Sequence, residues 1–321
     1  MKIYYAPYSL QPKHSLNSLA QRTQREGALL KVEDGGFAGY ADLHPLIEFG
    51  DLSLADHLKS LKSASPSLLA ERSLHLAYKD LQARKSKMSL IRNQKLKNNF
   101  MIADILSFDF DQLQKLEDFK TLKIKVGRDW KKEAEALNEL KAYPFRVRLD
   151  ANSSFTANSF HDFLYLLEDA FLEKIEYIED PTPYELNSWR EFQKQVPVAI
   201  DFELEKASKT LMDAGFSVVI LKSSRQNVED LVDKSIAANL KITFTSSMDH
   251  LVGIAHGVAI AESYKNKYPE NVLDSGFLTY ELFEEDEFSR EVSIKDTSLH
   301  FPSGFGIGFS KELEACHWKE L

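Results

Sequence analysis

The sequence predicts an α/β protein with a (β/α) barrel, preceded by a region of mixed β and α structure. The main observation is that short apolar runs alternate with amphipathic helical patterns over residues 99–273, with a repeat of about 21 to 29 residues. The second is that the first 45 residues are typical of strands and do not follow this repeat. Alternating strands and helices favour a parallel sheet, and eight such units are enough to close it into a barrel.

The N-terminal region is expected to form a β-hairpin followed by helices. Apolar runs at 29–32 and 37–41 flank a turn at 34–36, whose two glycines supply the positive φ angles that a tight hairpin requires. Leucine and alanine then recur at three- and four-residue spacing over 51–58 and 66–85. This spacing predicts two helices with one apolar face each.

The repeating region contains eight apolar runs with helical patterns between them. The expected strands lie at 99–103, 122–126, 146–149, 175–178, 196–200, 217–221, 241–244 and, more weakly, 271–273. The expected helices lie at 129–141, 157–172, 185–195, 205–214, 228–239 and 250–264. Because the eighth run is poorly formed, an open sheet or a short barrel remains an alternative to a closed one.

The composition excludes several classes of protein. The chain has 321 residues, with 40 Lys and Arg against 49 Asp and Glu, so its net charge of −9 predicts no nucleic-acid partner. No apolar run reaches the roughly 18–20 residues that span a bilayer, so we expect no membrane partner. The single cysteine, Cys316, fits a reducing cytoplasm and excludes zinc sites made of thiolates. The oligomeric state is left open.

Charged residues stand at the ends of consecutive predicted strands. Lys125 lies in the second run, and Asp150, Glu179, Asp201 and Lys222 directly follow the next four. The carboxyl ends of barrel strands converge on one mouth, where the active sites of this fold lie. We therefore expect three carboxylates from adjacent strands at the mouth, with a lysine on each side.

Three converging carboxylates require a counter-charge when they are partly shielded from water. The simplest counter-charge is a divalent cation, and ligation by oxygen alone favours Mg²⁺ or Mn²⁺ over zinc or copper. The hypothesis is a metal site formed by Asp150, Glu179 and Asp201.

Lys123 and Lys125 form a Lys-x-Lys pair within an apolar run. Residues two apart on a strand face the same side, so both ammonium groups are expected to point into the barrel. Burial and mutual repulsion lower the pKa of a lysine in such a place, which would let it act as a general base near neutral pH.

These motifs together resemble the muconate-lactonizing branch of the enolase superfamily. The resemblance covers essentially the whole chain and rests on Lys123 and Lys125 and on the segments Leu-Asp-Ala-Asn at 149–152, Tyr-Ile-Glu-Asp-Pro at 177–181, Pro-Val-Ala-Ile-Asp at 197–201 and Ile-Leu-Lys at 220–222. Within the branch, the sequence is most similar to the o-succinylbenzoate synthase family, because Thr-Ser-Ser-Met-Asp at 245–249 resembles that family's Ser-Ser-x-Glu segment and the chain is compact.

The resemblance implies a (β/α)7β TIM-type barrel with an α+β capping domain formed by both chain ends. The implied capping domain comprises 1–95, with 276–321 returning to it, and the barrel comprises 96–275. Substrate specificity would then depend on cap loops around 12–25 and 42–51.

The resemblance also implies a Mg²⁺-dependent hydro-lyase of menaquinone biosynthesis that forms 2-succinylbenzoate from a small carboxylate, 2-succinyl-6-hydroxy-2,4-cyclohexadiene-1-carboxylate. Lys125 would take the α-proton and then protonate the departing hydroxyl, and Lys222 would stabilise the enolate. Lys123 would complete the catalytic set. The expected substrate contacts are Asn152, Ser246, Ser247 and Asp249.

Two other functions remain open. Lys125 and Lys222 could serve as opposed bases of an N-acylamino acid racemase or a dipeptide epimerase, although Asp274-Ser275-Gly276 offers only one aspartate of the pair that epimerases usually carry. The other alternative is a non-catalytic barrel that binds a protein through its cap. The sequence departs from the family pattern at Asp180, Ser223 and Asp249, which weakens the choice of substrate more than the choice of chemistry.

Overall fold

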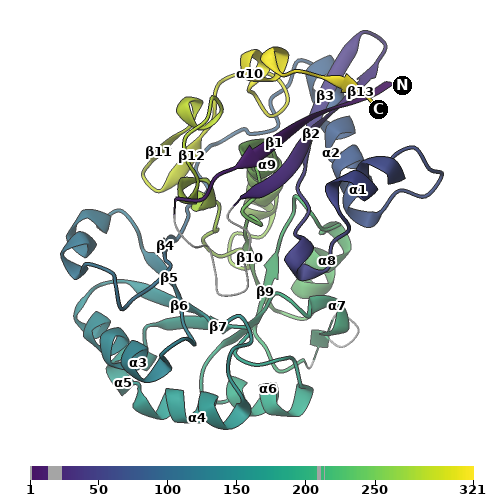
Figure 1. The fold of residues 1–321 in the computed structure, drawn as a ribbon. Coiled ribbons are helices and arrows are strands. Elements are labelled where there is room, and N and C mark those ends of the chain that lie inside the picture. Colours follow the sequence, from purple (N-terminus) through teal and green to yellow (C-terminus); the bar gives the residue numbers. More distant parts are fainter. Residues whose placement is uncertain (1, 14–23, 208–210, 213) are drawn as a thin grey trace.

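Two sheets organise the chain (Figure 1). The structure, a computed structural model, describes residues 2–13, 24–207, 211–212 and 214–321. An antiparallel sheet of order β13-β1-β2-β3 lies at the end of the molecule that carries both termini, and a parallel sheet of order β10-β9-β8-β7-β6-β5-β4 curls beside it. None of the described helices is long and apolar enough to cross a membrane.

The antiparallel sheet forms the cap and uses both ends of the chain. Its strands are β1 (Lys2–Leu10), β2 (Arg25–Asp34), β3 (Phe37–Leu43) and β13 (Lys319–Glu320). The predicted turn joins β2 to β3, and Gly35 and Gly36 have φ angles of 58° and 81°. Tyr4 in β1 pairs with Glu320 in β13, so the last residues of the chain complete the first sheet. Two helices, α1 (Leu54–Ser60) and α2 (Leu68–Lys85), pack on it.

The parallel sheet contains seven of the eight predicted strands. They are β4 (Phe100–Ile102), β5 (Thr121–Lys125), β6 (Arg146–Asp150), β7 (Ile175–Glu179), β8 (Val198–Ile200), β9 (Val218–Leu221) and β10 (Lys241–Phe244). All neighbouring pairs are parallel, and most strand residues are buried, as expected when helices cover the outside and side chains fill the inside.

The weak eighth run closes the ring through isolated bridges instead of a continuous strand. Val272 bridges in parallel to Ile242 of β10, and Ser275 bridges in parallel to Asn98, just before β4. Hydrogen bonds of 2.8 Å from Leu273 N to Ile242 O and from Asn99 N to Ser275 O support both contacts. The segment therefore joins the two edges of the sheet and makes it a barrel.

Helices follow six of the strands and cover the outside of the barrel. They are α3 (Trp130–Glu139), α4 (Ala157–Leu166), α5 (Asp169–Leu172), α6 (Leu186–Gln193), α7 (Leu204–Ala207), α8 (Glu229–Ala237) and α9 (Leu251–Lys267). The predicted single helix at 157–172 is divided, because Leu167 adopts an extended conformation and is buried. The predicted helix at 205–214 overlaps α7, and its residues 208–210 and 213 lie outside the described residues.

The C-terminal segment connects the barrel to the cap. It contains a 3₁₀ helix at Leu278–Leu282, the hairpin of β11 (Ser293–Lys295) and β12 (Ser298–His300), and α10 (Ser310–Ala315). The predicted (β/α)7β barrel with a cap built from both chain ends is thus confirmed. The division at 1–95, 96–275 and 276–321 stays a prediction.

Candidate active site

The register of the strands places the predicted charged residues side by side. Lys125 of β5 is opposite Asp150 of β6, and Asp150 is in turn opposite Glu179 of β7. Asp201 directly follows β8, and Lys222 directly follows β9. The structure therefore brings these charges to one end of the barrel, as the spacing predicted.

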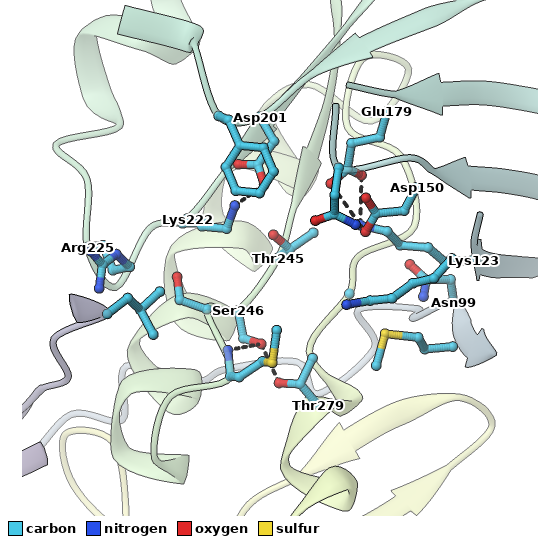
Figure 2. A pocket seen from close by; sticks show the side chains of 18 of the residues that line it. Asn99, Lys123, Asp150, Glu179, Asp201, Lys222, Arg225, Thr245, Ser246 and Thr279 are labelled. Carbon is cyan, nitrogen blue, oxygen red and sulfur yellow. Dashed lines mark hydrogen bonds and ion pairs between the residues drawn. The ribbon is translucent and has the colours of Figure 1, made fainter. Parts of the chain in front are cut away.

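A cavity of about 490 Å³ lies at this end of the barrel and is bordered by the cap (Figure 2). Its lining includes the predicted charged residues and residues of the cap loop, the barrel loops and the C-terminal segment. Residues of the lining include Phe49, Asn99, Met101, Lys123, Lys125, Asp150, Asn152, Glu179, Asp201, Phe202, Lys222, Arg225, Ser246, Ser247, Leu278 and Thr279.

Lys123 lies between two of the carboxylates. Its Nζ is 2.9 Å and 2.7 Å from the two carboxylate oxygens of Glu179 and 3.0 Å from Oδ2 of Asp150. Burial acts to lower the pKa of Lys123, but the charges of Asp150 and Glu179 outweigh it and hold that pKa well above its usual value. Lys123 is therefore a permanent cation in the floor of the cavity.

Lys125 has the opposite electrostatic setting, although it lies only two residues away on the same face of β5. Burial lowers its pKa, and the neighbouring charge of Lys123 adds to this effect, while Asp150 opposes it. Leu122 and Ile124 alternate with the two lysines and are fully buried on the outer face of the strand. The difference between the lysines fits Lys125 as the proton-transferring residue and Lys123 as a fixed charge.

The carboxylates of the site differ in how strongly their surroundings favour the charged form. Burial raises the pKa of Glu179 to about 7, and the charge of Asp150 adds to the effect. The pKa of Asp150 is lowered instead, because the charges of Lys123 and Lys125 outweigh the cost of burial. Asp201 forms an ion pair with Lys222 on the other side of the cavity, as Figure 2 shows.

The donor set fits a divalent cation of the magnesium type. Asp150, Glu179 and Asp201 are all buried, supply only oxygen ligands and come from adjacent strand ends. With the present side-chain positions, no three ligand-type side chains in the described part of the chain are close enough together for one ion. Lys123 lies between Asp150 and Glu179, and Lys222 forms an ion pair with Asp201. In this structure the positive charge beside the three carboxylates therefore comes from these two lysines.

Asp180, which departs from the family pattern, supports the site from behind. Its carboxylate accepts hydrogen bonds of 3.0 Å from the backbone N–H groups of Asp201 and Phe202, and its own φ angle is 43°. It therefore fixes the end of β8 and with it the direction of the Asp201 side chain. In the sequence, Asp180 stands out only as a departure from the family pattern, and its supporting role is not visible there.

The structure divides the predicted substrate-binding residues into two groups. Asn152, Ser246 and Ser247 line the cavity. Asp249 does not line it: the residue is 2% exposed, and its Oδ1 accepts a 2.6 Å hydrogen bond from the backbone N–H of Ser247. Asp249 is thus placed to support the cavity wall, not to contact a ligand.

Several cavity residues were not found by sequence reasoning. Phe49 of the predicted cap loop at 42–51 stacks on Phe202, with ring centroids 5.3 Å apart. Thr279 belongs to the C-terminal segment, and its hydroxyl hydrogen-bonds that of Ser246. Neither contact leaves a periodic signal in the sequence. Most of the other predicted cap loop, 12–25, lies outside the described residues.

The fold and the arrangement of lysines and carboxylates define a barrel enzyme of the enolase superfamily. The family described as "Enolase C-terminal domain-like" matches residues 110–315, and the family described as "O-succinylbenzoate synthase, N-terminal domain" matches residues 3–83. An o-succinylbenzoate synthase from Bdellovibrio bacteriovorus is 38% identical over 327 residues, covering 100% of this chain and 99% of the relative. The chain belongs to the o-succinylbenzoate synthase family of hydro-lyases.

Solved structures agree with this fold. The L-Ala-D/L-Glu epimerase from Bacillus subtilis has a TM-score of 0.81 at 17% identity, with 96% of this chain and 98% of that chain covered. The o-succinylbenzoate synthase from Thermosynechococcus elongatus BP-1, complexed with Mg in its active site, has a TM-score of 0.71 at 18% identity, with 89% and 95% covered. At these identities the likeness shows a shared fold.

Proposed function

We propose that the protein dehydrates 2-succinyl-6-hydroxy-2,4-cyclohexadiene-1-carboxylate to 2-succinylbenzoate, a step of menaquinone biosynthesis. The observation that carries the proposal is the set of three buried carboxylates between two lysines from opposite walls of one barrel mouth. The full-length similarity to an o-succinylbenzoate synthase supports the choice of substrate. The single cysteine supports a reducing compartment such as the cytoplasm.

Asp150, Glu179 and Asp201 would hold a Mg²⁺ ion, for which Mn²⁺ could substitute. When bound, the ion supplies Lewis-acid stabilisation of the negative charge that develops on the substrate carboxylate. Lys123 contacts both Asp150 and Glu179, so its fixed charge holds these two ligands and limits their repulsion.

Lys125 is the proposed base. Its lowered pKa gives a larger neutral fraction near physiological pH than an ordinary lysine has, so its Nζ can accept the α-proton. The same ammonium group then donates that proton to the departing hydroxyl, which requires both bonds to face Lys125 and makes the elimination syn. Lys222, on the opposite wall, stabilises the enolate through its positive charge.

The remaining lining fits a ring with a polar side chain. Phe49, Phe202, Met101 and Leu278 provide apolar surface for the cyclohexadiene ring. Asn152, Ser246 and Ser247 provide hydrogen-bonding groups for the succinyl chain.

A racemase or epimerase is the second candidate, because Lys125 and Lys222 both line the cavity and come from β5 and the end of β9, which are four strands apart in the barrel. One experiment separates the two functions: the protein and Mg²⁺ are incubated in D₂O with the cyclohexadiene substrate and, separately, with N-succinyl amino acids. We expect dehydration of the first compound. Deuterium incorporation into the amino acids without any dehydration would overturn the proposed function in favour of the second candidate.

A further inference from the structure

Lys222 is presented to the cavity by a tight turn at 222–226, between β9 and α8. The turn begins at Lys222, whose carbonyl accepts hydrogen bonds of 2.9 Å from the backbone N–H groups of both Arg225 and Gln226. The backbone N–H of Lys222 donates to Oε1 of Gln226 at 2.8 Å. Its side chain forms the ion pair with Asp201 (Figure 2). The position of the Lys222 ammonium group therefore depends on how this turn is held.

An arginine of the cap binds the residue that follows Lys222. Arg72 of α2 donates two hydrogen bonds to the carbonyl oxygen of Ser223, from Nε at 3.1 Å and from Nη2 at 2.7 Å. Ser223 is fully buried and Arg72 is 5% exposed, although 151 positions separate them in the chain. Two donors of one rigid guanidinium meet a single backbone acceptor, so they fix the direction of the peptide group after Ser223.

The charge of Arg72 is buried with little compensation from other groups. Among the described residues, Glu229 of α8 is the one carboxylate within ion-pair distance, at 3.6 Å from Nη1, and its side chain is 41% exposed. Lys79, two turns further along α2, shares this carboxylate at 3.1 Å. Burying a charge costs free energy, and an apolar side chain could fill the same space without that cost. The contacts that distinguish Arg72 are therefore those with the Ser223 carbonyl.

The cap holds the same turn at a second point. Arg225 directs its guanidinium to the His44 carbonyl at 2.8 Å and to Oδ2 of Asp51 at 2.5 Å. The same oxygen of Asp51 accepts a hydrogen bond of 2.6 Å from the backbone N–H of Leu46. Through Ser223 and Arg225, the turn is therefore bound both to helix α2 and to the cap loop.

We propose that Arg72 is a positioning residue for Lys222: its two hydrogen bonds to the Ser223 carbonyl set where the Lys222 ammonium group lies in the cavity. Arg72 itself does not line the cavity. The inference rests on the proposed function, in which Lys222 stabilises the enolate. Such stabilisation requires a charge that is already in place, and a displacement of about 1 Å can lower a rate about 10²-fold. The cap then takes part in the reaction without touching the reacting atoms.

A double-mutant cycle on kcat tests the proposal. Arg72→Met removes both hydrogen bonds and is expected to lower kcat about 10- to 100-fold, with a smaller change in KM. In a Lys222→Met background the same substitution should add little, because no ammonium group is left to position. Circular dichroism shows that each variant is folded. Equal losses of kcat in the two backgrounds would indicate a general structural effect and would overturn the proposal.

Two further variants separate the hydrogen bonds from the charge of α2. Lys79→Met removes the other cation that contacts Glu229 and leaves the Ser223 carbonyl bound, so its kcat is expected to stay near that of wild type. Arg72→Lys keeps the charge but lacks the planar fork of a guanidinium, so its kcat should lie between those of wild type and Arg72→Met. A loss with Lys79→Met as large as that with Arg72→Met would contradict the role. If Arg72→Met does not fold, Arg72→Lys takes its place in the cycle.

Hydrogen–deuterium exchange tests the support of the turn without measuring activity. Arg72→Met is expected to speed the exchange of the Arg225 and Gln226 amides, which bond within the turn, whereas Lys79→Met should not. Unchanged exchange in Arg72→Met would show that Arg72 does not hold the turn and would also overturn the proposal. If wild type fails to dehydrate the cyclohexadiene substrate, the proposed function fails, while the exchange result still decides whether the cap holds the turn that carries Lys222.

Discussion

Replacing Lys123 with methionine tests whether Lys123 and a bound cation both neutralise the carboxylates of the site. The ammonium group contacts Asp150 at 3.0 Å and Glu179 at 2.7 Å, and all three side chains are largely buried. Removing one partner of a buried ion pair costs about 3–5 kcal/mol, because a charge is left uncompensated. We therefore expect Lys123→Met to lower the free energy of unfolding by about that amount when EDTA is present.

A saturating concentration of Mg²⁺ should restore a large part of this loss, because the cation binds the carboxylates of the folded state. The assay is urea unfolding of wild type and variant, each with EDTA and with Mg²⁺. Lys125→Met is the matched control, because Lys125 lies on the same face of β5 but burial lowers its pKa, whereas the pKa of Lys123 is raised by the two carboxylates. An equal loss of stability for Lys123→Met with and without Mg²⁺ would refute the reasoning.

Three further predictions concern the charge on the opposite wall, the support of the metal site and the pH dependence. Lys222→Met is expected to lower kcat about 10²–10³-fold with a small change in KM, because it removes transition-state stabilisation. Steady-state kinetics measure both constants, and an unchanged kcat would contradict this role. Asp180→Ala removes the acceptor for two backbone N–H groups beside Asp201 and should weaken Mg²⁺ binding about 10- to 100-fold by calorimetry, whereas unaltered binding would refute its supporting role. Since Lys125 must be neutral to accept a proton and its pKa is lowered, kcat/KM should rise with pH and level off below the ordinary lysine pKa of about 10.4; a rise that continues to that value would argue against Lys125 as the base.

The barrel could be predicted from the sequence because each strand and helix has its own local pattern of apolar residues. The β5 segment alternates buried Leu122 and Ile124 with Lys123 and Lys125, and the other strands are similarly short apolar runs. The ring closure at 271–276 leaves only a weak apolar pattern in the sequence, because it consists of a few bridges between the two edges of the sheet. The two-residue β13 is recognisable only once β1 is there to pair with it.

The charged centre of the site was predictable for a related reason. One charged residue per strand end, at the spacing of a βα unit, is a pattern that the barrel topology converts into proximity. The buried residues that support the site could not be predicted in this way. Asp180 acts through two backbone N–H groups of the next strand, and Asp249 acts through the Ser247 backbone, so the identity of these residues says little until the chain is folded.

Contacts in the wall of the cavity could not be predicted from the sequence either. Thr279 reaches Ser246 from the C-terminal segment, and Phe49 reaches Phe202 from the cap. Both contacts join segments that are separate in the chain, and the contact of Phe49 with Phe202 also depends on how the cap sits against the barrel. Tertiary packing alone brings them to the mouth.

The proposed mechanism depends on Lys125, which removes and returns the proton in a metal-dependent dehydration. The most direct measurement is the conversion of 2-succinyl-6-hydroxy-2,4-cyclohexadiene-1-carboxylate by wild type and Lys125→Ala in saturating Mg²⁺, with circular dichroism and Mg²⁺ titration to show that the variant is folded and binds the ion. Wild type is expected to form 2-succinylbenzoate and to stop when the metal is chelated, and the folded variant is expected to form none. Turnover by Lys125→Ala at the wild-type rate would show that Lys125 is not the base.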